Sequence, residues 1–245
     1  MLNPGFRRAG WLAAVVLAAG VQNLQGQAGG SSATTARKGG MPMDQSTEGA
    51  EYTVVFKSQW TSARHPFEYP AAGLITGPHF SGIIGAAHDA SFAIFSEGSL
   101  PTPGLERLSE EGKHTPLDGE LRAAITAGTA VNLLTTGPLR DFSDSIVATI
   151  RVDARHPLVS FVAMIAPSPD WFTGVAGVNL MEGGAWVASR TIELPAYDSG
   201  GDDGMTYKAA DQDNSPKKPV TRGSTRHFAP GGAPVPVASV TFTRK

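Results

Sequence analysis

Apolar and polar residues alternate in several stretches of the chain, and this alternation predicts short β-strands. Between Glu51 and Lys57, the side chains of Tyr52, Val54 and Phe56 occupy every second position, which is the period of a strand with one buried face. Further strand candidates are residues 91–95, 130–135, 145–153, 158–166, 175–180, 186–194 and 237–243. About eight short strands separated by turns rich in Gly and Pro predict an all-β fold, an antiparallel β-sandwich.

Two of these segments are expected to bury different amounts of surface. In residues 145–153 the apolar side chains fall on one face, as in a strand with a single buried side. Residues 158–166 are almost continuously apolar, which favours a central strand that is buried on both faces.

Two short helices are predicted in the connections. Residues 105–111 have helical spacing of leucines, and Gly112 is a suitable stop. Residues 119–127 have a second helical pattern, with Asp118 as the candidate N-cap. Residues 208–232 are polar and rich in Pro and Gly, so we expect a long surface loop there.

The first residues have the pattern of a secretory signal peptide. Arg7 and Arg8 precede an apolar run over residues 11–21, and small and polar residues follow it. We therefore expect a signal peptide over residues 1–28 and a secreted or periplasmic protein. The run is shorter than the roughly 20 residues of a membrane-spanning helix, so no transmembrane anchor is expected after cleavage.

Composition fits an exported, turn-rich domain. Residues 29–49 are mostly small or polar and predict a flexible linker, which leaves 50–245 for the folded domain. The chain has no cysteine, so the domain must fold without disulfides. The net charge is −2 and the basic residues are scattered, which argues against a nucleic-acid partner. A monomer is expected.

Acidic residues cluster in residues 198–204, which read Asp-Ser-Gly-Gly-Asp-Asp-Gly and contain no Lys or Arg. Like charges this close are stable only when they are solvated, protonated or neutralised by a cation. The spacing is not that of an EF-hand, which needs Gly at the sixth and Glu at the twelfth position. The alternative is a site assembled from loops, in which Asp170 meets Asp198 and Asp202. From residue types alone, a calcium site and a solvated acidic turn both remain open.

Other chemistry is weakly indicated. The six histidines are scattered without the spacing of a zinc motif, and hydrogen bonding between loops is their simplest role. No serine lies in a Gly-x-Ser-x-Gly elbow. Asp170 and the later aspartates offer a carboxylate pair for glycoside hydrolysis, although carboxylates that hold calcium are not free to carry protons. Most aromatic residues are expected in the core, and Trp171 is the aromatic most suited to an exposed binding face.

The order of segments resembles the spondin domain, the N-terminal module of the F-spondin and mindin family. Residues 52–56, 65–70, 79–88 and 104–112 match in order. The two most specific matches are residues 160–171, which end in Pro-Ser-Pro-Asp-Trp, and the acidic loop. The resemblance extends over about residues 50–243.

The resemblance implies a β-sandwich that carries one calcium ion. The family's ligating aspartates correspond to Asp170, Asp198 and Asp202, whereas Asp203 stands where the family often has Ser and is expected to face solvent or to support the ligands. Animal members carry cysteines and further modules, so the sequence resembles the stand-alone, bacterial type.

The expected function is therefore that of an exported, non-enzymatic adhesion or recognition module, in which calcium orders loops at one end of the sandwich. Its partner would be a surface, matrix or glycan ligand. Two alternatives remain: a secreted hydrolase that uses the same carboxylates, and a purely structural exported protein.

Overall fold

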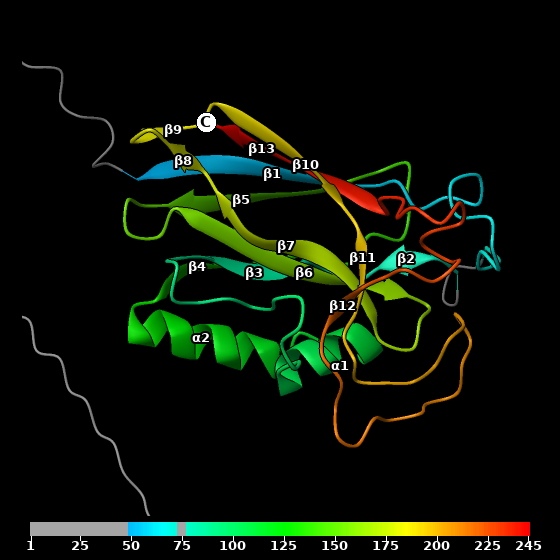
Figure 1. Cartoon of the computed structure of the whole chain (residues 1–245). Coiled ribbons are helices and arrows are strands. Elements are labelled where there is room, and N and C mark those ends of the chain that lie inside the picture. The colour runs from blue at the N-terminus through cyan, green and yellow to red at the C-terminus, as the bar shows by residue number, and fades with distance from the viewer. Residues whose placement is uncertain (1–48, 73–76) are drawn as a thin grey trace, which may run out of the picture. The chain divides into compact units, whose positions relative to one another are not determined.

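The computed structural model describes residues 49–72 and 77–245 (Figure 1). The predicted signal peptide, 1–28, and all but the last residue of the predicted linker, 29–49, lie outside the described residues. Within the described part of the chain, neither helix has the length and apolar character needed to cross a bilayer.

One sheet has four antiparallel strands in the order β10 (Ser189–Leu194), β13 (Ala238–Arg244), β1 (Ala50–Ser58) and β5 (Ile146–Val152). Every second residue of β1 is buried, so the predicted alternation of this strand is confirmed. The same holds for β5, where the apolar face predicted from the sequence is turned inward.

The second sheet carries the candidate site. Its order is β12 (Thr221–Arg222), β11 (Ala196–Asp198), β7 (Trp171–Asn179), β6 (Leu158–Ala166), β3 (Ile84–His88) and β4 (Ala130–Thr135), with β2 (His79–Phe80) also paired to β6. A small hairpin of β8 (Met181–Glu182) and β9 (Ala185–Trp186) stands apart from both sheets. All the pairings are antiparallel, and the two sheets form the predicted β-sandwich.

Two helices cover the outer face of the second sheet, α1 (Pro103–Glu111) and α2 (Leu117–Ala127) (Figure 1). The Thr102 hydroxyl caps α1 by accepting a hydrogen bond from Leu105 N at 3.1 Å. The predicted stop at α1 is confirmed, because the residue after it adopts a left-handed conformation. The prediction that Asp118 is the N-cap of α2 is wrong. Asp118 lies inside the first turn of the helix, where its negative charge interacts favourably with the helix dipole.

The second sheet therefore separates two apolar cores. One core fills the space between the sheets and includes Phe56 and Phe161. The other packs Val162 and Phe172 against leucines of the two helices. Strand β6 contributes to both cores, so the prediction of a central strand buried on both faces is confirmed.

Some predictions about the connections are wrong. Residues 91–95 form no strand, although Ile94 and Phe95 are buried beneath the helices. Residues 208–232 are not only a surface loop, because they include β12 and the buried Phe228. A pair of apolar residues predicts burial, and a Pro-rich composition predicts turns. Neither pattern shows whether a segment pairs with another strand.

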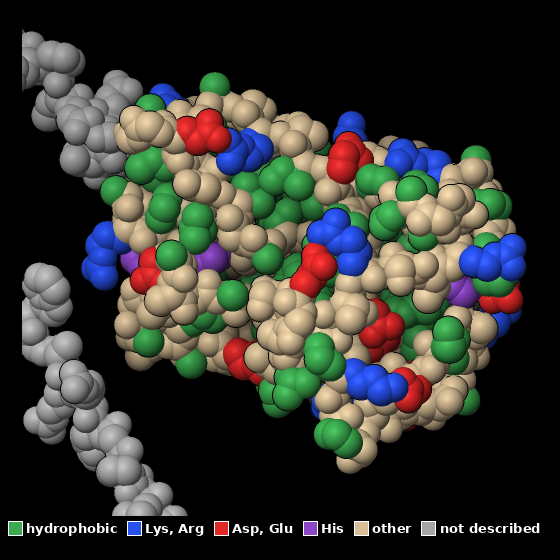
Figure 2. All heavy atoms as spheres, in the orientation of Figure 1, with side chains coloured by type: hydrophobic (Ala, Val, Ile, Leu, Met, Phe, Trp, Pro, Cys, Tyr) green, Lys and Arg blue, Asp and Glu red, His purple; other side chains and the backbone are tan. Residues whose placement is uncertain are grey.

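The surface drawn in Figure 2 carries acidic and basic side chains interspersed rather than gathered by sign. This distribution agrees with the near-neutral net charge of −2.

Candidate metal centre

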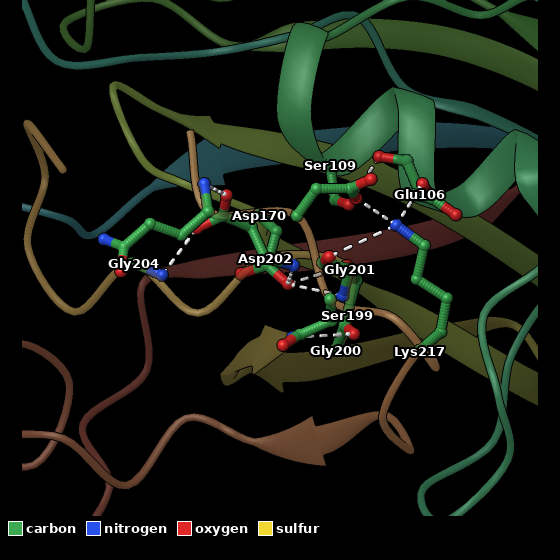
Figure 3. Close-up of polar contacts among 12 residues, drawn as sticks. Glu106, Ser109, Asp170, Ser199, Gly200, Gly201, Asp202, Gly204 and Lys217 are labelled. Atoms are coloured by element: carbon green, nitrogen blue, oxygen red, sulfur yellow. Dashed lines mark hydrogen bonds and ion pairs between the residues drawn. The ribbon is translucent and has the colours of Figure 1, made fainter. Parts of the chain in front are cut away.

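Strand pairing brings the two acidic regions of the sequence together (Figure 3). Asp170 ends the turn between β6 and β7, and the next residue, Trp171, pairs with Asp198 at the end of β11. The amide of Ser199 also donates to the carbonyl oxygen of Asp170 at 3.3 Å. The register of β7 and β11 therefore places the loop that follows Asp198 beside the turn that carries Asp170.

Asp170 is fully buried, and its two carboxylate oxygens have different surroundings. Oδ2 accepts hydrogen bonds from Ser199 Oγ at 2.9 Å, from Gly201 N at 2.9 Å and from Asp202 N at 3.2 Å. Oδ1 is buried and has no hydrogen-bond partner among the described residues. A buried carboxylate oxygen without a partner is costly, and a bound cation removes that cost.

The other two aspartates are held by backbone amides. Asp198 Oδ1 accepts from Gly200 N at 3.0 Å, and the indole of Trp171 bonds the same carboxylate. The carboxylate of Asp202 accepts from the amides of Gly204 and Gln212. These contacts fix the loop before any ion is bound.

Burial sets the electrostatics of the centre. It raises the pKa of Asp170 to about 6, and the nearby charge of Asp198 adds to the rise, while the three hydrogen bonds to Oδ2 oppose it. Burial also raises the pKa of Asp198, against the hydrogen bond from Gly200. Without a cation, the charged carboxylates of Asp170 and Asp198 are held at a cost to the folded state.

A pH dependence of stability follows for the metal-free protein. The pKa of Asp170 is about 6 in the folded state, against 3.8 for an ordinary aspartate, so the folded state binds this proton more tightly than the unfolded state. Stability is therefore lost as the pH rises from 3.8 to about 6. The loss amounts to about 3 kcal/mol. Urea denaturation in chelator should show it as a difference between wild type and Asp170→Asn, and parallel pH profiles would contradict it.

The backbones of Asp198 and Asp202 lie beside Asp170, but the three carboxylates do not form a compact acidic group. Among the residues the structure describes, the group of three acids with oxygens all within 4.8 Å of one another is Glu106, Glu110 and Asp213. The carboxylates of Asp198 and Asp202 are turned toward backbone amides instead. Because their backbones already lie beside Asp170, side-chain rotation is the change that shared ion binding requires.

The sequence did not single out Glu106, Glu110, Asp213 or Lys217. Glu106 and Glu110 are four positions apart on α1, a spacing that places both on one helix face and was the available signal. Nothing in the sequence indicated that this face packs on the acidic loop. Asp203, by contrast, lies as predicted at the surface, where it pairs with Lys218.

A pocket of about 420 Å³ opens beside Asp198 and Asp202. Met205, a large and exposed apolar side chain, lines it together with Lys218. Trp171 also lines the pocket but is only 2% exposed, so the prediction of an exposed Trp171 is wrong. Its ring packs instead on Phe228.

The histidines have the predicted role of hydrogen bonding between loops. Each of the six has a hydrogen-bond partner, and for His65, His79 and His114 this partner is a backbone carbonyl. His88 and Ser160 are 2.7 Å apart, Nε2 to Oγ, but both are buried, so substrate cannot reach this pair.

Comparisons with known proteins agree with the fold and with the order of these segments. The family model described as Spondin_N matches residues 50–231. Spondin-2 of Rattus norvegicus is 31% identical over 227 residues, which cover 88% of this chain and 65% of that protein. Spondin-2 of Homo sapiens is 32% identical over 174 residues, or 70% of this chain and 52% of the relative.

Spondin-1 of Mus musculus is 27% identical over 185 residues, or 70% of this chain and 21% of that protein. The chain thus spans less than two thirds of the length of these relatives. Because the family model matches most of the described chain, including the aspartate turn and the acidic loop, the protein belongs to the Spondin_N family.

Proposed function

We propose that this protein is an exported, non-enzymatic recognition module in which Asp170, Asp198 and Asp202 hold one calcium ion. The observation that carries the proposal is the buried Oδ1 of Asp170, which has no partner among the described residues although three hydrogen bonds serve its other oxygen. Export is supported by the predicted signal peptide and by membership in the spondin family.

The donor set suits calcium. All three side chains offer hard carboxylate oxygens, and Asp198 and Asp202 flank the glycines of a loop that tolerates the irregular geometry calcium accepts. Bound calcium would supply positive charge that offsets the repulsion among the three carboxylates. Ser199 and Gly201 hold the carboxylate of Asp170 in place, whereas the carboxylate of Asp198 would turn from the Gly200 amide toward the ion.

Calcium is expected to raise the melting temperature of the purified protein. At 100 times its dissociation constant, an ion that binds the folded state adds about 2.7 kcal/mol. For a domain of this size that corresponds to a rise of about 5–10 °C. Asp198→Ala and Asp202→Ala should abolish the rise.

Asp141→Ala is the matched control, because Asp141 also caps a turn through Ser143 but is exposed and lines a different pocket from Asp198 and Asp202. It should leave the calcium response unchanged. Identical melting curves of wild type with calcium and with chelator would refute the calcium site.

Recognition is proposed to take place at the pocket beside Asp198 and Asp202, because it is continuous with the metal centre and lined by the exposed Met205. The expected ligand is a surface, matrix or glycan component. Glycan arrays and binding to matrix proteins, with and without calcium, test this role, with Met205→Asp as the pocket variant.

Two other functions have distinct outcomes. A hydrolase that uses the same carboxylates would turn over glycoside or ester substrates in the presence of chelator. A structural protein would respond to calcium but bind no ligand. The raised pKa of Asp170, about 6, agrees with a proton-carrying acid as well as with a metal ligand, so the substrate screen is needed.

A further inference from the structure

Helix α1 turns two acids toward the acidic loop. Glu106 and Glu110 lie one helical turn apart, and Asp213 approaches them from the far side of the loop. One oxygen from each of these residues lies within 4.8 Å of the other two. Three carboxylates this close are stable only when they are solvated, protonated or neutralised by a cation. Asp213 is exposed to solvent, and burial together with the charge of Glu106 raises the pKa of Glu110 to about 7.

The positive charge comes from the chain itself (Figure 3). Lys217 Nζ is 2.7 Å from Glu106 Oε1, forms an ion pair with Asp213 Oδ1, and donates to the carbonyl oxygen of Gly201 at 3.3 Å. The ammonium therefore has three oxygen partners, two charged and one neutral. Glu110 is not among them, and its Oε1 has no hydrogen-bond partner among the described residues.

Glycine at position 201 connects this cluster to the metal centre. Its amide donates to Asp170 Oδ2 at 2.9 Å, while its carbonyl accepts from Lys217. A Cβ atom at this position would lie 2.6 Å from Glu110 Oε1 and 3.1 Å from Glu106 Cγ, so the side chains of both acids pack against the loop here. A single residue thus touches the Lys217 cluster on one side and Asp170 on the other.

Lys218, the neighbour of Lys217, has a different environment. Its ammonium pairs with Asp203 alone among the residues that the structure describes, and the side chains of this pair are 55% and 52% exposed. The side chains of Lys217 and Glu106 are 26% and 24% exposed, whereas that of Asp213 is 68% exposed. Charge removal at the two lysines is therefore a matched comparison between a semi-enclosed cluster and a solvated pair.

We propose that the Lys217 ammonium takes the place of a metal ion in the Glu106–Glu110–Asp213 cluster and ties α1 to the loop of the metal centre, making Lys217 a positioning residue. The protein would then need one exogenous cation, not two. The positioning part of this proposal rests on the proposed function, because it assumes that the loop binds calcium. The other part, that the Lys217 ammonium stands in for a metal ion among the three acids, does not depend on calcium binding.

The test removes the ammonium and asks whether a metal ion replaces it. It is carried out on the full chain carrying Asp198→Asn, so that the proposed calcium site is already disabled. Adding Lys217→Met should create a new response: the melting temperature falls in chelator and recovers by several degrees with millimolar calcium or manganese. Adding Lys218→Met instead should create no such response.

Two further variants identify the cause. Lys217→Arg keeps the charge and should not create the response. Glu106→Gln combined with Lys217→Met removes one acid, and should abolish most of the metal response because the cluster then has less charge to compensate. If the Lys217→Met protein is unfolded in chelator, its refolding on addition of calcium is the same supporting result.

The proposal is overturned if the two lysine variants respond alike, or if Lys217→Met gains no response to either ion. This outcome is separate from failure of the proposed calcium function, which the wild-type melting curve tests alone. If calcium leaves the melting temperature of wild type unchanged and only Lys217→Met gains a metal response, the calcium site is refuted and the role of Lys217 is supported.

Discussion

Asp170→Asn is expected to stabilise the protein in chelator and to abolish its stabilisation by calcium. The carboxylate of Asp170 is fully buried, and burial raises its pKa to about 6. Removing the charge relieves up to about 3 kcal/mol at neutral pH. The amide oxygen can still accept from Ser199 and Gly201, but the new N–H donors replace the unpaired oxygen and offset part of the gain.

The order of stability should therefore reverse with calcium. In chelator the variant is more stable by up to about 3 kcal/mol, and at 1,000 times the dissociation constant wild type gains about 4.1 kcal/mol that the variant cannot. Urea denaturation under the two conditions measures both values. Asp203→Asn is the control, because its carboxylate is solvent-exposed and should show no reversal. The same order of stability in both conditions would contradict a calcium role for Asp170.

Gly200→Ala should be strongly destabilising and should also weaken the response to calcium. Gly200 has a φ of 79°, and a Cβ atom there would lie 2.2 Å from the carbonyl oxygen of Lys218. The amide of Lys218 donates to the carbonyl oxygen of Gly200 at 2.9 Å, so the clash would separate two hydrogen-bonded segments. Backbone strain and overpacking together cost on the order of 3 kcal/mol.

Gly119→Ala is the matched substitution, and it is expected to change the stability of the protein in the opposite direction to Gly200→Ala. Gly119 lies in α2, and a Cβ atom there would meet nothing within 4 Å. Since Ala favours the helix over Gly, this change should stabilise the protein by roughly 0.5–1 kcal/mol. If both glycine variants lose stability equally, the close approach at Gly200 is not the cause.

The pattern of the sequence was sufficient for the long strands and insufficient for the short ones. Strand β1 was predicted by its alternation and β6 by its continuous apolar run. Strand β3 was missed because its sequence, Ile-Gly-Ala-Ala-His, neither alternates nor favours a strand. Its small residues have a structural reason, since a Cβ atom at Gly85 would lie 2.0 Å from the carbonyl oxygen of Ser160.

For the candidate site, the sequence supplied the aspartates but not their support. The grouping of Asp170 with the acidic loop came from residue types and from the family resemblance, and the pairing of β7 with β11 agrees with it. The role of Lys217 depends on where α1 packs, which is a tertiary contact between segments far apart in the chain. Local periodicity carries no information about such contacts.

Strand β6 belongs to both apolar cores and leads directly into the turn that carries Asp170. The two helices that cover its outer face are therefore part of the support of the site. Any evolutionary or engineered trimming of residues 103–127 would uncover one side of the strand that feeds the site. The smallest part of this domain that we expect to fold and to keep the site therefore contains both sheets and the helix layer.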